Sequence, residues 1–424
     1  MKVLWFCNLV PSRISSHVAG RHFSPSGGWI EGLLNSLPKN NEIDISIAFP
    51  LYGSKTIISG EVDEIKYFAF PQIKSDINKY NPKTRDNAES IINRVSPDII
   101  HIFGTEYIHT LAIINACEKL EILNKIVVSI QGLVSILSRN YYAGLPQSVV
   151  YRYTFRDFIK QDNIRQQRKK YIERGKYEIE ALQKVRHVVG RTDWDKACTS
   201  QINPLAQYHF CNETLRDEFY KHSWELDKCE RYSIFISQAS YPIKGLHFAL
   251  EALPEIIKRF PSTHLYIAGV DITRDDSLIS RIKMSYYGKY IKKLIRKKKL
   301  QRNITFTGPL DEKAMCERFI GSHVFVSPST MENESNSVSE AKLLGVPVVT
   351  SFVGGVAGRL INNESGFLYQ HDAPYMLTYY ICRIFENDDL AHRLSENAKK
   401  HAATLHDPEA NLEQILQIYG EILV

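Results

Sequence analysis

The segment VFVSPSTMENESNSVSEAKLLGVPVV, residues 324–349, contains a strand, a polar loop and a helix in close succession. The run Val324–Ser327 is apolar at successive rather than alternating positions, which is typical of a strand buried on both faces of a parallel sheet. A helix is predicted to begin near Ser337, to run over Val338–Leu344 and to end at Gly345-Val346-Pro347. This order predicts one strand–helix unit of a doubly wound α/β fold.

Similar apolar runs recur along the chain, each followed by a segment with helical spacing. In the first half, strands are predicted at Val3–Phe6, Ile45–Phe49, Ile99–Phe103, Ile126–Ile130 and His187–Gly190. In the second half, strands are predicted at Ile234–Ser237, Leu265–Ala268, Ile304–Thr307, Val324–Ser327 and Val346–Thr350. Two such sets predict two α/β units, each with a parallel sheet covered by helices.

The polar stretch Asn212–Arg231 has no strand pattern and is the predicted linker between the two sets. The length of 424 residues also favours two domains, because single cores rarely grow beyond ~250–300 residues. We therefore expect a first Rossmann-like domain over 1–215, a second over 216–400 and a helical segment over 401–424.

The composition is that of an ordinary globular protein, with 44% hydrophobic and 24% charged residues. The seven cysteines are scattered, without a CxxC pair or a Cys/His cluster, which favours reduced thiols in a cytoplasm over disulfides or a structural metal. The apolar run in MKVLWFCNLVPS is interrupted by Asn8, so a buried first strand is expected there rather than a signal peptide. No apolar stretch approaches the ~18 residues of a membrane span. We expect a soluble intracellular protein.

The segment 281–302 has ten Lys/Arg and no Asp or Glu. Helical spacing places Tyr287, Ile291, Leu294 and Ile295 on one face, so the simplest interpretation is a solvated basic helix packed on the second domain. The alternative is attraction to an anionic membrane surface or to a phosphate-bearing acceptor. Nucleic-acid binding is not supported, since no recognition motif accompanies the charge.

Two glutamates flank the predicted start of the helix in the segment 324–349. Glu332 lies in the loop at the carboxyl end of the strand, where ligands bind in open α/β sheets. Glu340 lies one turn into the helix, and the free N–H groups around Ser337–Ser339 suit a diphosphate. Two structural interpretations stay open: Ser337-x-x-Glu340 is also a capping box, and Glu332 and Glu334 also fit solvated loop carboxylates.

Two further loops carry candidate binding residues. After the strand Ile234–Ser237, the loop SQASYPIKG contains Lys244, whose charge can neutralise a leaving diphosphate, although an exposed loop lysine is the commoner explanation. In SPSGGWIEGLL, Gly27-Gly28 opens a helix and allows close approach of a ligand, although such a pair is more often a simple turn.

The segment 324–349 resembles the paired-glutamate signature of family 4 retaining glycosyltransferases (glycosyl transferases group 1), here in the form EN-x-x-NS-x-x-EA. The resemblance covers almost the whole chain but is dense only from Ser237 to Phe367. It implies a GT-B fold, with two Rossmann-like domains facing across a cleft, the first on the acceptor side and the second on the donor side. It also implies a metal-independent enzyme without a cofactor, whose donor substrate is a UDP- or GDP-linked sugar.

The resemblance assigns roles to the donor-side residues. Glu340 would hold the ribose hydroxyls, Glu332 would contact the donor sugar near the reacting carbon, and the backbone at Asn336, Ser337 and Val338 would bind the diphosphate. Lys244 matches the family's lysine-glycine pair. The family's arginine about five residues earlier is replaced by Ala239, and its neighbours Gln238 and Ser240 are uncharged binding candidates.

The resemblance also points to residues of the first domain. The Gly27-Gly28 loop would lie across the cleft from the diphosphate. Gln131 stands where many relatives carry a histidine, so it can hydrogen-bond the donor sugar but cannot act as a base. His101 and Glu106 are candidates on the acceptor side.

Two other motifs receive an interpretation from the family. Gly354-Gly355 matches a glycine loop beside the donor pocket, and the segment after Asp407 is expected to return to the first domain. Asp193-Trp194-Asp195 has the spacing of a metal-chelating pair in another glycosyltransferase architecture. Family 4 members carry a similar segment without a metal, so we expect none here.

The expected function is transfer of a sugar, with retention of configuration, to a hydroxyl of a glycan or lipid-linked acceptor in bacterial surface-polysaccharide synthesis. Two alternatives remain: a catalytically silent paralogue that binds a nucleotide sugar or a partner, and a nucleotide-sugar epimerase on the same fold. Ala239 and Gln131 keep the silent paralogue open. The presence of Lys244, Glu332 and Glu340 argues against it.

Overall fold

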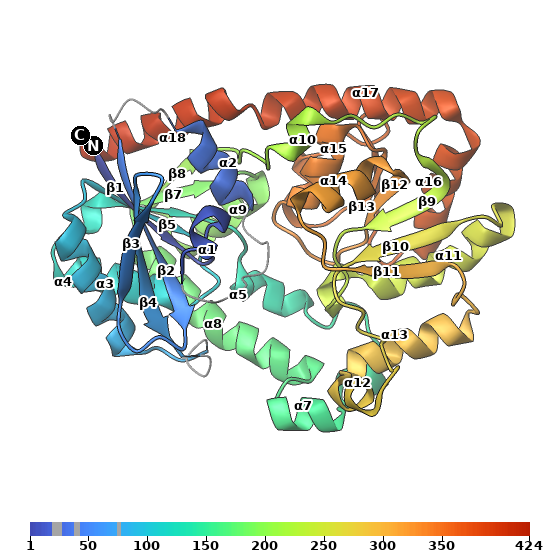
Figure 1. The fold of residues 1–424 in the computed structure, drawn as a ribbon, viewed down its shortest axis with the longest axis horizontal. Coiled ribbons are helices and arrows are strands. Elements are labelled where there is room, and N and C mark those ends of the chain that lie inside the picture. The colour runs from blue at the N-terminus through green and yellow to red at the C-terminus, as the bar shows by residue number, and fades with distance from the viewer. Residues whose placement is uncertain (19–27, 38–42, 74–77) are drawn as a thin grey trace. The chain divides into compact units, whose positions relative to one another are not determined.

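The computed structural model describes residues 1–18, 28–37, 43–73 and 78–424. The chain forms two compact units, each made of segments that are distant in the sequence (Figure 1). The first unit contains Met1–Ile136, Lys170–Arg216 and His406–Val424, and the second contains Leu137–Lys169 and Asp217–Leu405.

The first unit is built on an eight-stranded sheet in the order β3-β4-β2-β1-β5-β6-β7-β8. Its strands are β1 (Lys2–Cys7), β2 (Asp44–Tyr52), β3 (Ile58–Val62), β4 (Ile65–Gln72), β5 (Ile99–Phe103), β6 (Ile126–Ser129), β7 (His187–Gly190) and β8 (Gln207–Phe210). All neighbours are parallel except β3 and β4, which form an antiparallel hairpin at the sheet edge. In the two-residue turn of this hairpin, Asp63 and Glu64 both have positive φ, as a tight hairpin turn requires.

Helices cover both faces of this sheet, which explains why its central strands are apolar at successive positions. The helices are α1 (Ser12–Ser15), α2 (Gly28–Ser36), α3 (Pro82–Val95), α4 (His109–Lys119), α5 (Val134–Leu137), α8 (Ile164–Lys184), α9 (Asp193–Ile202) and α18 (Pro408–Leu423). On one face Trp5 packs with α2 and α18, and on the other Leu4 packs with α3 and α4. The hydroxyl of Tyr419 in α18 accepts a hydrogen bond from Trp5 Nε1 at 3.0 Å, so the C-terminal helix is part of the first unit's core.

The second unit has a six-stranded, fully parallel sheet in the order β11-β10-β9-β12-β13-β14. Its strands are β9 (Glu230–Ile236), β10 (His264–Ala268), β11 (Ile304–Gly308), β12 (Ser322–Ser327), β13 (Val348–Ser351) and β14 (Phe367–Tyr369). Its α-helices are α6 (Gln147–Val150), α7 (Phe155–Lys160), α10 (Glu218–Lys221), α11 (Leu246–Arg259), α12 (Leu278–Lys283), α13 (Tyr286–Lys297), α14 (Glu312–Ile320), α15 (Asn336–Leu344), α16 (Pro374–Glu386) and α17 (Asp388–Leu405). Two 3-10 turns, η4 (Pro242–Lys244) and η5 (Gly354–Gly358), follow β9 and β13.

Each of the ten predicted strands overlaps a strand of the structure, and the prediction of two doubly wound sheets is confirmed. The hairpin β3–β4, the edge strand β8 and the short β14 were not predicted. The sequence also gave no sign that residues 137–169 pack with the second unit. There, His247 Nε2 bonds to the carbonyl of Ala143 at 2.8 Å, and Asp157 accepts a hydrogen bond from the backbone N–H of Tyr286 at 2.8 Å.

The seven cysteines are all free thiols, and all except Cys198 are buried. Among the described residues, no helix combines the length and the apolar character that crossing a bilayer requires.

Candidate functional site: a donor-binding edge in the second unit

Three loops leave neighbouring strands at the same edge of the second sheet. β9 leads through η4 into α11, β12 leads through residues 328–335 into α15, and β13 leads into η5. These strands are adjacent in the order β9-β12-β13 and parallel, so their carboxyl ends share one edge. Open α/β sheets bind ligands at this edge.

Two predicted site residues meet there. Lys244 Nζ lies 2.5 Å from Glu332 Oε1, and the hydroxyl of Ser329 donates to the same carboxylate oxygen at 2.7 Å. The side chains of Lys244 and Glu332 are 17% and 14% exposed, so both are restrained by neighbours but still open to solvent. Lys244 is therefore not the exposed loop lysine of the simpler interpretation.

Glycines bring the three loops into contact around this pair. Gly245 has φ +70°, and a Cβ built on it would lie 1.8 Å from the carbonyl oxygen of Pro328. Gly354 has φ +50°, and a Cβ there would lie 1.8 Å from the carbonyl oxygen of Glu332. That carbonyl also accepts a hydrogen bond from Gly355 N at 3.1 Å. Only glycine fits at both close approaches, so these positions hold the Glu332 loop in place.

The start of α15 differs in detail from the prediction. The helix begins at Asn336 with Ser335 as N-cap, whose side chain makes no capping hydrogen bond. The capping-box interpretation of Ser337-x-x-Glu340 is therefore wrong, because Ser337 lies inside the helix. The backbone N–H groups of Val338 and Ser339 both donate to the carbonyl of Ser335, at 2.8 and 3.2 Å. The Val338 N–H, predicted to bind the diphosphate, is thus engaged within the helix start, and the backbone at Asn336 and Ser337 remains the candidate for an anion there.

Glu340 lies one turn into α15 and is 5% exposed. The structure places Glu340 on the same helix as Asn336 and Ser337 and, through the loop 328–335, on the same strand–loop–helix unit as Glu332.

The loop carboxylate Glu334 is not solvated, and its role was missed in the sequence. Its Oε1 accepts a hydrogen bond from Arg359 Nε at 2.7 Å, and the two side chains are only 2% and 5% exposed. The hydroxyl of Ser339 donates to the same oxygen at 3.3 Å. This buried ion pair ties the Glu332 loop to the residue that follows η5. Nothing in the sequence distinguishes such a pair from two surface charges.

A buried lysine lies next to this pair. Lys342 is 1% exposed, donates from Nζ to the backbone carbonyl of Arg359, and lies 3.1 Å from His401 Nδ1. Burial, together with the nearby positive charge of Arg359, lowers the pKa of Lys342 to about 7.

The remaining donor-side candidates lie in the loop after β9. Gln238 and Ser240 are exposed, whereas Ala239, at the position of the family's arginine, is 3% exposed. Ser240 lines a pocket of about 660 Å³ within the second unit. The cations that line this pocket are Arg156, Arg274 and Lys283.

The candidates of the first unit lie at the corresponding edge of its own sheet. Gly27 lies outside the described residues. Gly28 begins α2, and a Cβ there would lie 2.3 Å from the side chain of Arg216, so the helix start is packed closely. Gln131 donates from Nε2 to Glu213 Oε1 at 2.6 Å, and Arg191 forms an ion pair with the same carboxylate.

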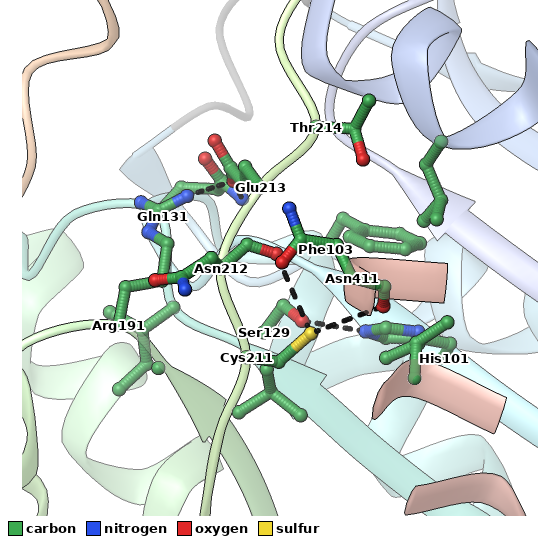
Figure 2. A pocket seen from close by; sticks show the side chains of 15 residues that line it. His101, Phe103, Ser129, Gln131, Arg191, Cys211, Asn212, Glu213, Thr214 and Asn411 are labelled. Carbon is green, nitrogen blue, oxygen red and sulfur yellow. Dashed lines mark hydrogen bonds and ion pairs between the residues drawn. The ribbon is translucent and has the colours of Figure 1, made fainter. Parts of the chain in front are cut away.

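Figure 2 shows Gln131, Arg191 and Glu213 around a small cavity of about 40 Å³, which His101 also lines. A cavity of this size holds a water molecule or two but no sugar. The structure thus gives Gln131 a partner within the first unit, beside a cavity that is too small for a sugar.

His101 is a core residue and not an acceptor-side group. It is fully buried, with Nδ1 at 2.7 Å from the hydroxyl of Tyr419 and Nε2 at 2.6 Å from that of Ser129. Burial lowers the pKa of His101 to about 3, so the ring is neutral at pH 7. The expectation of a role for His101 toward an acceptor is wrong.

Glu106 does lie at the sheet edge, in the loop after β5. It accepts a hydrogen bond from Asn8 Nδ2 at 2.9 Å, and burial raises its pKa to about 7. A Cβ on Gly104, φ +93°, would lie 2.1 Å from Asn8 Nδ2 and 2.4 Å from Glu106 Oε2. The close packing of these loops therefore depends on a glycine, as at the donor-side edge.

The Asp-x-Asp motif has a structural explanation. Asp195 is buried in the first turn of α9 and forms a capping box with Thr192, in which Asp195 N donates to the Thr192 hydroxyl at 3.1 Å. Its carboxylate also accepts hydrogen bonds from Arg191 N at 3.1 Å and from the Tyr208 hydroxyl at 2.5 Å. Asp193 is exposed. The two carboxylates therefore do not form a chelating pair.

Comparison with known proteins supports the assignment of the donor-binding unit. Residues 216–401 match the family model described as Glycosyl transferases group 1. Glycogen synthase of Mycobacterium tuberculosis is 26% identical over 186 residues, which are 44% of this chain and 41% of the relative. The matched stretch thus spans only about two fifths of such a relative.

Solved structures match over almost the full length of the chain. Sucrose-phosphate synthase from Thermosynechococcus elongatus is similar with a TM-score of 0.72 and 16% identity, covering 100% of this chain and 99% of that one. Anabaena HepE in complex with UDP-glucose is similar with a TM-score of 0.65 and 14% identity, covering 99% and 100%.

These likenesses define the class of protein: the chain has the GT-B fold, with two Rossmann-like units. Within it, residues 216–401 are similar to the glycosyl transferases group 1 family, the family that the EN-x-x-NS-x-x-EA motif resembles.

Proposed function

We propose that this protein is a retaining, metal-independent glycosyltransferase of the hexosyltransferase type. It moves a sugar from a nucleotide-sugar donor to a hydroxyl of an acceptor. The observation that carries the proposal is the ion pair between Lys244 and Glu332, beside the start of α15, at the ligand-binding edge of a group 1 family domain.

Each donor-side residue has a role that its position supports. Glu340 binds the ribose hydroxyls, and Glu332 orients the donor sugar near its reacting carbon. Lys244 and the backbone of Asn336 and Ser337 receive the diphosphate, with Gln238 and Ser240 beside it. Lys244 pairs with Glu332, and the donor diphosphate would offer the lysine a second anionic partner.

The reaction breaks the bond between the anomeric carbon of the donor and the diphosphate oxygen, which leaves with the bonding electrons. The acceptor oxygen forms the new bond to the anomeric carbon on the same face, and its proton passes to the departing diphosphate. Negative charge grows on the diphosphate, and Lys244 with the start of α15 stabilises it. Glu332 forms no covalent bond in this scheme.

The donor is a UDP- or GDP-linked sugar. The binding of UDP-glucose by HepE, which has the same fold, favours the uridine nucleotide as the first donor to test. The acceptor is a glycan or a lipid-linked oligosaccharide in surface-polysaccharide synthesis, bound by the first unit through groups such as Glu106. A lipid-linked acceptor would place the protein in the cytoplasm at the inner face of a membrane, with the basic segment 281–302 toward it.

One observation favours a second candidate, a catalytically silent paralogue. Ala239 is buried where the family has an arginine, and Gln131 is engaged with Glu213 in the place of a histidine. Such a protein would bind a nucleotide sugar without transferring it.

Release of free nucleotide from UDP- and GDP-sugars separates the two candidates. We expect release by the purified protein, accelerated by glycan or lipid-linked acceptors, and loss of release in Glu332→Gln and Lys244→Met. The exposed Glu364→Gln serves as control and should behave like the unchanged protein. Donor binding without any nucleotide release would favour the silent paralogue.

A further inference from the structure

Two short helices of the second unit expose large apolar side chains. In α7 and the residues before it, Tyr151, Tyr153, Phe155, Phe158 and Ile159 are 55–68% exposed. In α12, Leu278, Ile279 and Ile282 are 57–75% exposed. We call these eight residues the α7–α12 surface. An apolar cluster of this kind on a folded protein marks an interaction site more often than chance exposure.

The two helices form one surface. They are in contact and lie side by side in Figure 1. Asp157, which is 1% exposed, accepts a hydrogen bond from Thr154 N at 3.0 Å in the capping box of α7. The same carboxylate oxygen accepts one from Tyr286 N at 2.8 Å, at the start of α13 directly after α12. The buried carboxylate of Asp157 thus links α7 to the start of α13, and α7 also contacts α12 directly, so the exposed side chains are held by ordered backbone.

The segments that carry or follow the apolar side chains are rich in basic residues. The segment 281–302 has ten Lys/Arg without an acidic residue, and the segment 151–170 has seven Lys/Arg and two aspartates. One face of α13 is buried through Tyr287 and Ile291, which turns its lysines outward.

Part of this charge is compensated within the protein. Asp275 forms ion pairs with Lys292 and Arg296, and Glu251 pairs with Lys298 at 2.7 Å. In contrast, Lys289, Lys293 and Lys297 are exposed and form no ion pair within the described part of the chain. These three lysines give α13, the helix that follows α12, an uncompensated positive charge.

We propose that the α7–α12 surface docks on an anionic lipid bilayer. Aromatic and aliphatic side chains enter the interface while Lys289, Lys293 and Lys297 attract the anionic headgroups. Charge complementarity selects this occupant, because a neutral apolar partner would leave the exposed lysines of α13 without an anionic partner. The proposal goes beyond the basic segment itself, since most of the apolar contact comes from residues 151–160.

The direct test is co-sedimentation of the full chain with vesicles, without donor or acceptor, so that its outcome is independent of the proposed reaction. We expect binding to vesicles that contain phosphatidylglycerol, little binding to pure phosphatidylcholine, and weakening of the binding by 0.5 M salt. No binding to either vesicle, or equal binding to both, would overturn the proposal. Salt-sensitive self-association of the chain without vesicle binding would overturn it in favour of a second copy as occupant.

Two sets of substitutions locate the surface. Phe155→Ser with Phe158→Ser and Ile159→Ser should abolish vesicle binding, whereas the matched exposed set Leu205→Ser with Tyr375→Ser and Tyr379→Ser should not. Reversal of Lys289, Lys293 and Lys297 to Glu should weaken binding by roughly a hundredfold or more, at about 1 kcal/mol for each basic residue lost near the surface. The same reversal at the exposed Lys55, Lys313 and Lys400 changes the net charge equally and should leave most binding intact. Equal loss in both charge-reversal proteins would contradict a local surface.

Discussion

The ammonium group of Lys244 lies 2.5 Å from a carboxylate oxygen of Glu332, although 88 residues separate them in the chain. Their strands β9 and β12 are neighbours in the parallel sheet, so the loops that carry them emerge at one edge. The pair occupies the position where the proposed reaction needs a cation for the diphosphate and a carboxylate near the donor sugar.

Replacing this lysine should lower the rate more than it lowers donor binding. Lys244→Met keeps much of the side-chain length but removes the charge that stabilises the departing diphosphate. We expect kcat/KM to fall by about a hundred- to a thousandfold, the usual effect of removing one donor to developing negative charge. Steady-state nucleotide release measures this, and Lys313→Met, at an exposed lysine, is the control. A fall confined to KM would mean that Lys244 only binds the donor.

The glycines that join the loops should not tolerate a methyl group. Gly245→Ala and Gly354→Ala would each place a Cβ 1.8 Å from a backbone oxygen at positive φ. We expect each substitution to lower the free energy of unfolding by about 1–3 kcal/mol. If the loop moves to relieve the clash, Glu332 is displaced and activity is lost. Chemical denaturation and nucleotide release measure the two effects. Gly420→Ala, at a helical position with nothing within 4 Å of the new Cβ, should be neutral or stabilising.

The buried ion pair of the Glu332 loop should be important for stability. Glu334→Ala leaves the Arg359 guanidinium buried without its carboxylate, which typically costs about 3–5 kcal/mol. Calorimetric unfolding should therefore show a clear loss in Tm. Glu225→Ala removes the partner of Lys228 in a largely exposed pair and should change Tm little. Similar Tm values for the two variants would contradict the role assigned to Glu334.

His101 should contribute to unfolding in acid. Its folded-state pKa of about 3 lies below the ordinary value of 6.5, because burial disfavours the charged ring. Between pH 6.5 and about 3 the unfolded chain binds more protons than the folded one, so stability falls as the pH falls through this window. The slope of unfolding free energy against pH should be smaller in His101→Gln than in the unchanged protein over this window.

Much of the fold could be predicted because strands covered on both faces by helices are apolar at successive positions. The hairpin β3–β4 was not predicted, because β3 is mostly exposed and lacks such an apolar run. Its turn residues, Asp63 and Glu64, are also not the usual glycine or asparagine. The placement of residues 137–169 with the second unit rests on tertiary contacts such as that of His247 with Ala143, which leave no local pattern.

The candidate site was predictable where strand order alone brings residues together. Lys244 and Glu332 follow strands of one parallel sheet, and their loops meet for that reason. Two other contacts depend on packing details that the sequence does not show. They are the hydrogen bond from Val338 N to the Ser335 carbonyl and the buried pair of Glu334 and Arg359. His101 was predicted as a site residue but lies in the core. A histidine in a strand has the same sequence pattern in both places, so the sequence could not separate them.

Donor binding tests the central claim most directly. We would measure the thermal shift of the purified protein with UDP, GDP, ADP and their common sugars, and repeat the series with Glu340→Ala. A ligand at a hundredfold excess over its dissociation constant stabilises the fold by about 2.7 kcal/mol. The account predicts a shift with UDP or GDP and its sugars that Glu340→Ala abolishes. No shift with any nucleotide, in protein that unfolds cooperatively, would contradict a nucleotide-sugar transferase.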